Sequence, residues 1–517
     1  MLLIRHSASC IIPTFGSMYL ISLLGFLSAV NGFGGHAMPG RYVDYCSRAT
    51  SQHARTRAKL TGGRYSTATN SGAFISSSKK SSSIRHEKAA SHIVRMRQSD
   101  DSDEASAPSS VRSRSIYLLY TGGTIGSVSG SDGGGLKPAN LTEFKSLLGN
   151  ISQLGKHPET GITDLNLNDD NDQNVDVDYM LDVMDPPLDS TEMVPKNWYQ
   201  IAFQILRAFK ENPDYDGAVV LHGTDTMAYT SSALAFLLKG LTKPVVVTGS
   251  QIPLVKPRSD ALRNFVSSVA ISAEGSSQGL KEVMVVFGSR ILRGCRATKI
   301  SADAFSGFDT PNYPHLGINA LTIEFDGPTL LKLPKDFPWL LDTPDKIESR
   351  MASLKKANDT KLDNFSVVAV HLYPGINETT VASMVSDTTR PVKGIVVRSY
   401  GAGNVPENIS GKDGPLAAAH NKGAVIVDTT QVLAGHVSIG TYAASANMAK
   451  ISVPGAGMTT EAAISKLVSI FANPEMYTTD CSPPRWDQDP IRFQKFAESV
   501  MMKSVVGEIG STDTPLT

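Results

Sequence analysis

The sequence is poor in cysteine and in net charge, and it lacks a nucleotide-binding motif. Its 517 residues hold four cysteines with no Cys-x-x-Cys spacing, which argues against a disulfide framework and a structural zinc site. Basic and acidic residues number 49 each, so no overall field favours nucleic acid or lipid as a partner. No Gly-x-Gly-x-x-Gly or Gly-x4-Gly-Lys string accompanies the glycine-rich turns, which argues against a dinucleotide or P-loop site.

The first hundred residues differ in composition from the rest of the chain. Met1–Val30 places basic residues ahead of an apolar stretch, as a secretory signal does; a short membrane anchor is the alternative. Residues 31–112 should be disordered, because Asn31–Ser99 is rich in serine and holds twelve basic against two acidic residues. A signal followed by such a segment indicates secretion or a plastid-like organelle. If the leader results from a gene model that begins too far upstream, a cytoplasmic protein is expected instead.

From residue 113 onward, short apolar runs alternate with segments of helical spacing. The predicted strands are Ile116–Tyr120, Ala218–Leu221, Pro244–Thr248, Val283–Phe287, Val367–Leu372, Gly394–Arg398 and Ala424–Val427, and the predicted helices include Trp198–Phe209 and Ser231–Lys239. This alternation predicts an α/β fold with mostly parallel, doubly wound sheets in two domains. We expect a larger N-terminal domain over 113–313, a linker over 314–363 and a smaller C-terminal domain over 364–517. The acidic tract Asp164–Asp178 is predicted to be a surface insertion.

Two strings that directly follow predicted strands carry the candidate chemistry. TGGTIG occupies residues 121–126, and HGTDTM occupies residues 222–227. Ligands of open α/β folds bind beyond the carboxyl ends of parallel strands, so Thr124 and Thr224 are candidate hydroxyl groups for acyl transfer. The alternative for the first string is a simple turn or a phosphate-cradling loop.

A threonine hydroxyl needs a base or a positive charge beside it to become a nucleophile. Lys299 could supply this, with Asp225 orienting it, so that Thr224, Lys299 and Asp225 form a hydroxyl–amine–carboxylate relay. The alternative for Lys299 is a surface lysine at the end of a strand. Asp189 and Ser190 follow on a loop and could bind a small carboxylate, or Ser190 could cap a helix.

Five strings taken in order resemble the bacterial-type L-asparaginases, in particular their type I, cytoplasmic-like branch. They are Tyr120 followed by TGGTIG, Pro187-Leu188-Asp189-Ser190, HGTDTMAYT from His222, VTGSQIPL from Val247, and Arg398-Ser399-Tyr400-Gly401. The similarity runs from about Ser115 to Ser511. It implies an amidohydrolase that converts L-asparagine, and more weakly L-glutamine, to the acid and ammonia without a cofactor or a metal.

The resemblance also implies a role for each candidate residue. Thr124 would attack the side-chain amide carbon, and Thr224 with Lys299 would activate either this nucleophile or the water that hydrolyses the β-aspartyl ester. The backbone N–H of Thr224 would stabilise the oxyanion. Asp225 would hold the α-amino group of the substrate. Asp189 and Ser190 would bind its α-carboxylate end.

Two further features depend on the resemblance. No tyrosine lies between Gly126 and Asp178, where many relatives have a lid tyrosine, and Tyr442 from a partner subunit is a substitute. Arg398 and Asn404 match a regulatory asparagine site of type I members; a buried ion pair at the domain contact is the alternative for Arg398.

The family assembles its sites at subunit contacts, so a homodimer or homotetramer is expected, with no nucleic-acid partner. Two alternative functions remain open at this point. One is an ammonia-supplying subunit of a tRNA-dependent amidotransferase, and the other is an inactive asparaginase-like binding protein.

Overall fold

A computed structural model of the chain describes residues 113–130, 135–155, 157–166, 174–387, 389–440, 443–480 and 482–510. All of these residues belong to one compact unit. The predicted leader, the predicted disordered segment and Tyr442 lie outside them. Across the described ranges, no helix combines the length and the apolar character that a membrane crossing needs.

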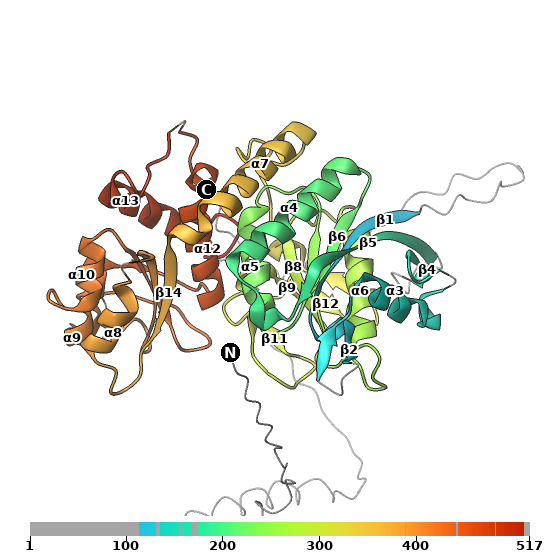
Figure 1. The fold of residues 1–517 in the computed structure, drawn as a ribbon, viewed down its shortest axis with the longest axis horizontal. Helices are drawn as coiled ribbons and strands as arrows, with labels where there is room; N and C mark the ends of the chain where they lie inside the picture. Colours follow the sequence, from blue (N-terminus) through green and yellow to red (C-terminus); the bar gives the residue numbers. More distant parts are fainter. Residues whose placement is uncertain are drawn as a thin grey trace, which may run out of the picture. The chain divides into compact units, whose positions relative to one another are not determined.

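The larger sheet has nine strands within the described residues, in the order β13-β12-β9-β8-β7-β6-β1-β5-β4 (Figure 1). Its parallel centre consists of β5 (Asn174–Leu188), β1 (Arg114–Gly122), β6 (Gly217–Leu221), β7 (Val245–Thr248) and β8 (Val283–Phe287). The antiparallel edges are β4 (Gly161–Asn166) on one side and β9 (Arg290–Arg293), β12 (Gly317–Asn319) and β13 (Ile323–Phe325) on the other. The central strands are continuous apolar runs because helices cover both of their faces.

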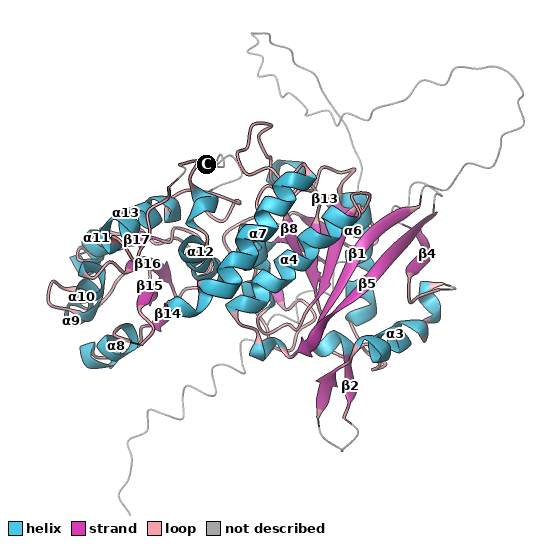
Figure 2. Cartoon of the chain, turned by 45° about the horizontal axis from the view of Figure 1, so that its top comes forward, coloured by secondary structure: helices cyan, strands magenta, loops and turns pink. Residues whose placement is uncertain are grey.

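Alternate residues of the central strands point into two hydrophobic clusters on opposite faces of this sheet. Leu119 and Val220 pack beneath α4 (Pro195–Glu211) and α5 (Met227–Leu237), whereas Leu118 and Val219 pack beneath α3 (Leu141–Gly149) and α6 (Ala261–Gly275). Figure 2 shows α4 and α6 on opposite sides of the strands. Helix α4 forms where the apolar spacing predicts it, and Pro195 starts it because the first turn needs no proline N–H.

The smaller sheet has four parallel strands in the described part of the chain: β14 (Ser366–His371), β15 (Val392–Ser399), β16 (Val425–Thr430) and β17 (Val453–Pro454). Helices α8 (Glu378–Val385), α9 (Glu407–Ser410), α10 (Pro415–Asn421), α11 (Met448–Ile451) and α13 (Pro490–Met501) surround it. Helix α12 (Thr460–Ala472) packs against this sheet and against α5, where the Ser465 hydroxyl donates to the Tyr229 carbonyl at 3.2 Å. The predicted α/β architecture with mostly parallel sheets is confirmed.

Two segments have a secondary structure that the sequence analysis did not predict. Residues 317–325 of the predicted linker form β12 and β13 at the edge of the larger sheet, and α7 (Pro344–Thr360) then packs along α4. Part of the acidic tract belongs to the long strand β5 rather than to a surface insertion. There, buried Val177 and Tyr179 alternate with exposed acidic residues, a period of two that marks a half-buried strand.

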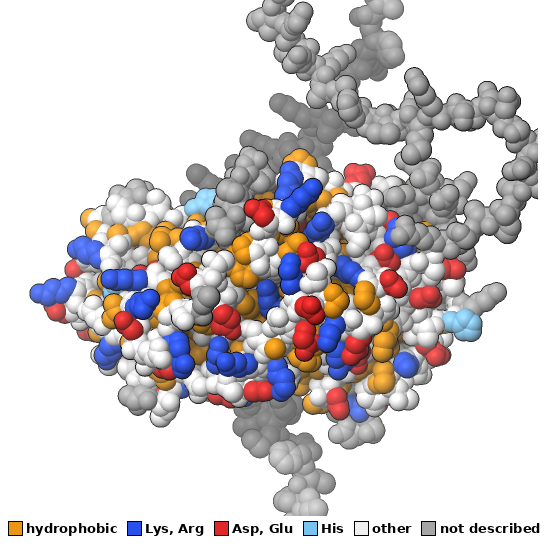
Figure 3. Space-filling model, turned by 90° about the horizontal axis from the view of Figure 1, so that it is seen from above, with side chains coloured by type: hydrophobic (Ala, Val, Ile, Leu, Met, Phe, Trp, Pro, Cys, Tyr) orange, Lys and Arg blue, Asp and Glu red, His pale blue; other side chains and the backbone are white. Residues whose placement is uncertain are grey.

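The surface carries charges of both signs. On the face shown in Figure 3, lysine and arginine side chains are interspersed with aspartate and glutamate, and none of them forms a broad field of one sign. This distribution agrees with the equal numbers of basic and acidic residues in the sequence. Mixed charge of this kind produces no long-range field of one sign over this face.

One carboxyl group is buried in the smaller sheet, and no ion pair to it occurs among the described residues. Asp428 on β16 is fully buried, and neither of its carboxyl oxygens has a hydrogen-bond partner among the described residues. Burial raises the pKa of Asp428 from 3.8 to about 6. The folded state therefore resists ionisation, and its stability falls as the pH rises from about 4 to about 6.

We expect Asp428→Asn to gain stability relative to the natural protein as the pH rises. The relative gain between pH 4 and pH 8 should reach about 3 kcal/mol, because one pKa unit corresponds to about 1.4 kcal/mol. Urea unfolding of both proteins at pH 4, 6 and 8 measures it, with Asp336→Asn at an exposed position as the control. A difference that stays constant across this range would contradict the prediction.

Candidate active site

Three loops meet at one edge of the larger sheet because three of its strands are adjacent and parallel. Tyr120 of β1 pairs with Leu221 of β6, and Gly122 of β1 pairs with Leu188 of β5. The TGGTIG and HGTDTM strings and the Asp189–Ser190 step therefore leave the sheet side by side at the carboxyl ends of these strands. The hydroxyl of Thr121 donates to the Leu221 carbonyl at 3.0 Å and links the first two loops.

Glycine is required where the loops touch. Gly122 and Gly123 have φ values of +118° and +83°, which L side chains rarely adopt. A Cβ on Gly122 would lie 2.0 Å from the Leu188 carbonyl oxygen, and one on Gly123 would lie 2.3 Å from the Cα of Gly223. Thr124 follows directly, half-buried at the start of a 3-10 turn over Thr124–Gly126. The backbone approach thus places Thr124 next to the loop that carries Thr224.

Lys299 lies between the two residues with which the sequence-based hypothesis grouped it. It is on β10 (Thr298–Lys299), and its Nζ donates to Thr224 Oγ1 at 2.9 Å and to Asp225 Oδ1 at 2.7 Å. Thr224 is buried, the Lys299 side chain is 21% exposed, and the Asp225 side chain is 58% exposed. The geometry therefore joins a sheltered hydroxyl to a lysine whose partner carboxylate is open to solvent.

Asp189 and Ser190 stand at the same edge with different surroundings. Ser190 is buried, and its carbonyl accepts a hydrogen bond from the Thr226 hydroxyl at 2.7 Å. The helix cap considered as the alternative role of Ser190 is formed by Asp189, whose Oδ1 accepts from the N–H and the hydroxyl of Thr191, both at 3.0 Å. The cap falls one residue earlier because the 3-10 turn begins at Ser190 itself.

Two supporting residues were not predicted from the sequence. His222 is buried between the Gly223 carbonyl, 2.7 Å from Nδ1, and the Thr230 hydroxyl, 2.9 Å from Nε2. Burial lowers the pKa of His222 to about 4, so this ring is neutral near pH 7 and braces the loop. Glu461, at the start of α12, accepts from the Thr298 hydroxyl at 2.7 Å and so contacts the strand of Lys299. No signal in the sequence indicated this second contact, because Glu461 lies 163 residues from Thr298.

Arg398 and Asn404 lie in the smaller sheet's part of the fold, at and beyond the end of β15. The ion pair considered for Arg398 is not found among the described residues, where its Nε has no hydrogen-bond partner. Asn404 Oδ1 is likewise buried without a partner there. In the described part of the chain, neither side chain forms a hydrogen bond to Thr124, Thr224, Asp225 or Lys299. Burial raises the pKa of the Tyr229 phenol on α5, and Arg398 lies close enough to offset part of that rise. No group of His, Cys, Asp and Glu suited to hold a metal ion occurs in the described ranges.

Comparison with known proteins identifies the class of this fold and site. The family model "Asparaginase, N-terminal" matches residues 115–329, and "Glutaminase/Asparaginase C-terminal domain" matches residues 366–478. The chain is 34% identical over 359 residues to L-asparaginase 1 of Escherichia coli K12, covering 69% of this chain and 91% of that one. It is 31% identical over 299 residues to a glutamyl-tRNA(Gln) amidotransferase component of Pyrococcus abyssi, covering 55% of this chain and 60% of that protein.

A solved structure agrees with these matches. The crystal structure of L-asparaginase I from Vibrio cholerae superposes with a TM-score of 0.56 at 28% identity and covers 77% of this chain and 99% of its own. Fold and sequence together define a hydrolase of the asparaginase type, built from a larger and a smaller α/β domain. The chain belongs to the asparaginase/glutaminase family, and the resemblance to its type I branch is confirmed.

Proposed function

We propose that this protein is an L-asparaginase that hydrolyses L-asparagine to L-aspartate and ammonia through a covalent threonyl ester. The observation that carries the proposal is the hydrogen-bonded group of Lys299, Thr224 and Asp225. It lies beside a glycine turn that delivers Thr124 to the same sheet edge. Acyl transfer needs an activated hydroxyl and a second group that moves protons; in this proposal Thr124 is the hydroxyl and the Lys299–Thr224 pair is the second group.

In the first half of the proposed reaction, the Thr124 hydroxyl attacks the side-chain amide carbon of asparagine. Its proton passes toward the leaving nitrogen with the help of the Lys299–Thr224 pair, and ammonia departs. The backbone N–H of Thr224 is the proposed donor to the oxyanion of the tetrahedral intermediate. In the second half, the same pair activates a water that cleaves the β-aspartyl ester and frees Thr124.

Substrate binding in this proposal uses the remaining loops. Asp225 Oδ1 accepts the lysine hydrogen bond, so Oδ2 is left to accept one from the substrate α-ammonium group. The Ser190 hydroxyl and nearby N–H groups bind the α-carboxylate. Asp189 acts indirectly, because its carboxylate is engaged in capping Thr191 and holds the Ser190 turn.

Ammonia release by the purified full-length chain tests the proposed function. We expect turnover of L-asparagine with kcat/KM about 10- to 200-fold above that for L-glutamine, since the two substrates differ by one methylene. A folded chain that does not hydrolyse free asparagine would overturn the proposal. Ammonia release that appears only with an added tRNA-charging partner would favour the amidotransferase alternative.

Assembly and regulation are tested in the same preparation. We propose a homodimer or homotetramer, which analytical ultracentrifugation measures directly.

We also propose that Arg398 and Asn404 bind asparagine as an effector. Their unpartnered polar atoms among the described residues, Nε and Oδ1, support a site that accepts a polar ligand. Sigmoidal dependence of the rate on asparagine concentration would be the corresponding observation.

A further inference from the structure

The last described residues of the chain form a mostly buried loop after α13. Residues 503–510, here called the C-terminal clasp, fold around Glu508, whose carboxylate accepts from the N–H groups of Val505 and Val506 at 3.0 and 2.9 Å. Glu508 and Lys466 of α12 are both fully buried and form an ion pair at 2.5 Å. Lys466 Nζ also donates to the Lys503 carbonyl at 2.7 Å. The clasp is therefore fixed to the helix that packs on the smaller sheet.

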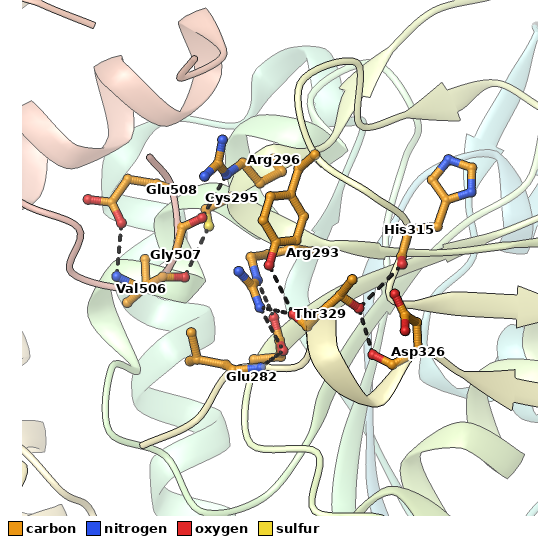
Figure 4. A network of polar contacts seen from close by, with 12 residues as sticks. Glu282, Arg293, Cys295, Arg296, His315, Asp326, Thr329, Val506, Gly507 and Glu508 are labelled. Carbon is orange, nitrogen blue, oxygen red and sulfur yellow. Dashed lines mark hydrogen bonds and ion pairs between the residues drawn. The ribbon is translucent and has the colours of Figure 1, made fainter. Parts of the chain in front are cut away.

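The other side of the clasp contacts the larger sheet's part of the fold. Arg296, 2% exposed, ends a 3-10 turn over Gly294–Arg296 and donates from Nε to the Gly507 carbonyl at 2.6 Å and from Nη2 to the Gly510 carbonyl at 2.9 Å. The Cys295 thiol donates to the Val506 carbonyl at 3.4 Å. Figure 4 shows Arg296 and Cys295 directed at the clasp. One buried arginine thus binds two of its backbone carbonyls.

The same arginine stands at the base of the Lys299 hairpin. Arg296 lies three positions before Lys299, whose strand β10 pairs antiparallel with β11 (Phe308–Asp309). Tyr313 follows β11, and the Arg296 guanidinium lies over its ring, 4.8 Å from the ring centre. The Tyr313 hydroxyl donates to the Thr329 carbonyl at 3.0 Å, an oxygen that Arg293 also binds at 2.7 Å. Arg296 and Tyr313 therefore hold the hairpin at the ends of both strands.

We propose that the C-terminal clasp positions Lys299 for the reaction, and that Arg296 is the positioning residue through which it acts. The inference rests on the proposed function only for the role of Lys299. Strand β10 has only two residues, so contacts from outside the hairpin must fix its position. Glu461 and Arg290 supply contacts to the two strands, and Arg296 supplies the one at the base, three residues before the lysine that must reach both Thr224 and Asp225. A misplacement of about 1 Å can cost about 100-fold in rate. The clasp also lies beyond the residues that the C-terminal family model matches.

Arg296→Lys in the full-length chain tests the proposal, because lysine keeps the charge but lacks the fork that binds two carbonyls. The matched control is Arg350→Lys. Arg350 is also buried and donates to the Leu237 and Lys239 carbonyls at 2.9 and 3.3 Å, which lie outside the clasp. For each variant we would measure kcat and KM on L-asparagine. We would also measure the rate of reductive methylation of Lys299 by formaldehyde and cyanoborohydride, read by mass spectrometry.

Arg296→Lys should lower kcat about 10- to 100-fold with little change in KM. In this variant the reagents should methylate Lys299 faster than in the natural protein. Methylation of Lys243, which donates to the Pro213 and Tyr215 carbonyls, should not change and reports on general loosening. Arg350→Lys should leave kcat and Lys299 methylation unchanged. If Arg296→Lys behaves like Arg350→Lys, the proposal is wrong.

A second variant keeps the test informative if Arg296→Lys fails to fold. Glu508→Gln removes the charge that pairs with Lys466 and loosens the clasp from its other side, so the same changes at Lys299 are expected, and their absence overturns the proposal. The methylation measurement does not depend on turnover. If the natural protein releases no ammonia, the proposed function fails, while faster Lys299 methylation in the variants still supports the clasp.

Discussion

Replacing Thr124 with alanine is expected to lower kcat for L-asparagine by about 10⁴-fold or more, which is the usual cost of removing a nucleophile. The side chain is half-buried at the start of its turn, so the loss of one hydroxyl should leave the fold intact. Thr124→Ser keeps a hydroxyl and should retain measurable turnover. Ammonia release in steady state measures both variants. Mass spectrometry after acid quenching should detect an aspartyl adduct on the natural protein and on Thr124→Ser only.

The control for this prediction is Thr142→Ala, an exposed threonine on α3 with no place in the proposed site. It should show the kcat of the natural protein. Wild-type turnover by Thr124→Ala would remove Thr124 from the mechanism. An aspartyl adduct on another threonine, Thr224 above all, would reassign the nucleophile to that residue while preserving the proposed ester chemistry.

Replacing Lys299 with methionine is expected to lower kcat by about 10²- to 10⁴-fold, the range found for groups that move protons in the transition state. The change removes the donor to Thr224 Oγ1 and to Asp225 Oδ1 at once. The loss of the Asp225 contact should cost little stability, because that side chain is 58% exposed and solvent replaces the lost partner. The buried Thr224 hydroxyl also loses its donor, which adds the cost of one hydrogen bond. Steady-state kinetics and a thermal unfolding midpoint measure the two effects separately.

A double-mutant cycle decides whether the lysine works through the threonine. If Lys299 and Thr224 act as one unit, Lys299→Met combined with Thr224→Val should cost no more than the larger single loss. Losses that multiply would show that the two groups serve separate steps. Lys145→Met, at an exposed position of α3, is the matched control for the loss of a lysine and should leave kcat unchanged.

Local patterns in the sequence were sufficient for most of the sheet. Val, Ile and Leu runs predicted the central strands because a strand buried on both faces must be apolar throughout. The same reasoning missed β5, whose acidic outer face made the tract from Asp164 look like an insertion. It also assigned β12 and β13 to a linker, since strands of three residues at a sheet edge carry too short a pattern to be recognised.

The loops of the candidate site were predictable for a related reason. TGGTIG and HGTDTM each follow a strand, and adjacent parallel strands end at the same edge. The positions of the two strings after predicted strands were therefore enough to predict that Thr124 and Thr224 lie at the same edge of the sheet. The reason for glycine at Gly122 and Gly123 became clear only with the structure, which shows the backbone of Leu188 and Gly223 where side chains would otherwise lie.

Composition and motif order thus predict the fold class and the family correctly and nominate the candidate residues, because each depends on neighbours in the chain or on strand order. The contacts between distant segments depend on packing that no local pattern encodes. Lys299 lies 75 residues from Thr224, Glu461 lies 163 from Thr298, and the clasp at Gly507 lies 211 from Arg296. Only the complete tertiary structure brings these atoms within hydrogen-bond distance, because the buried hydrophobic clusters determine where the elements that carry them lie.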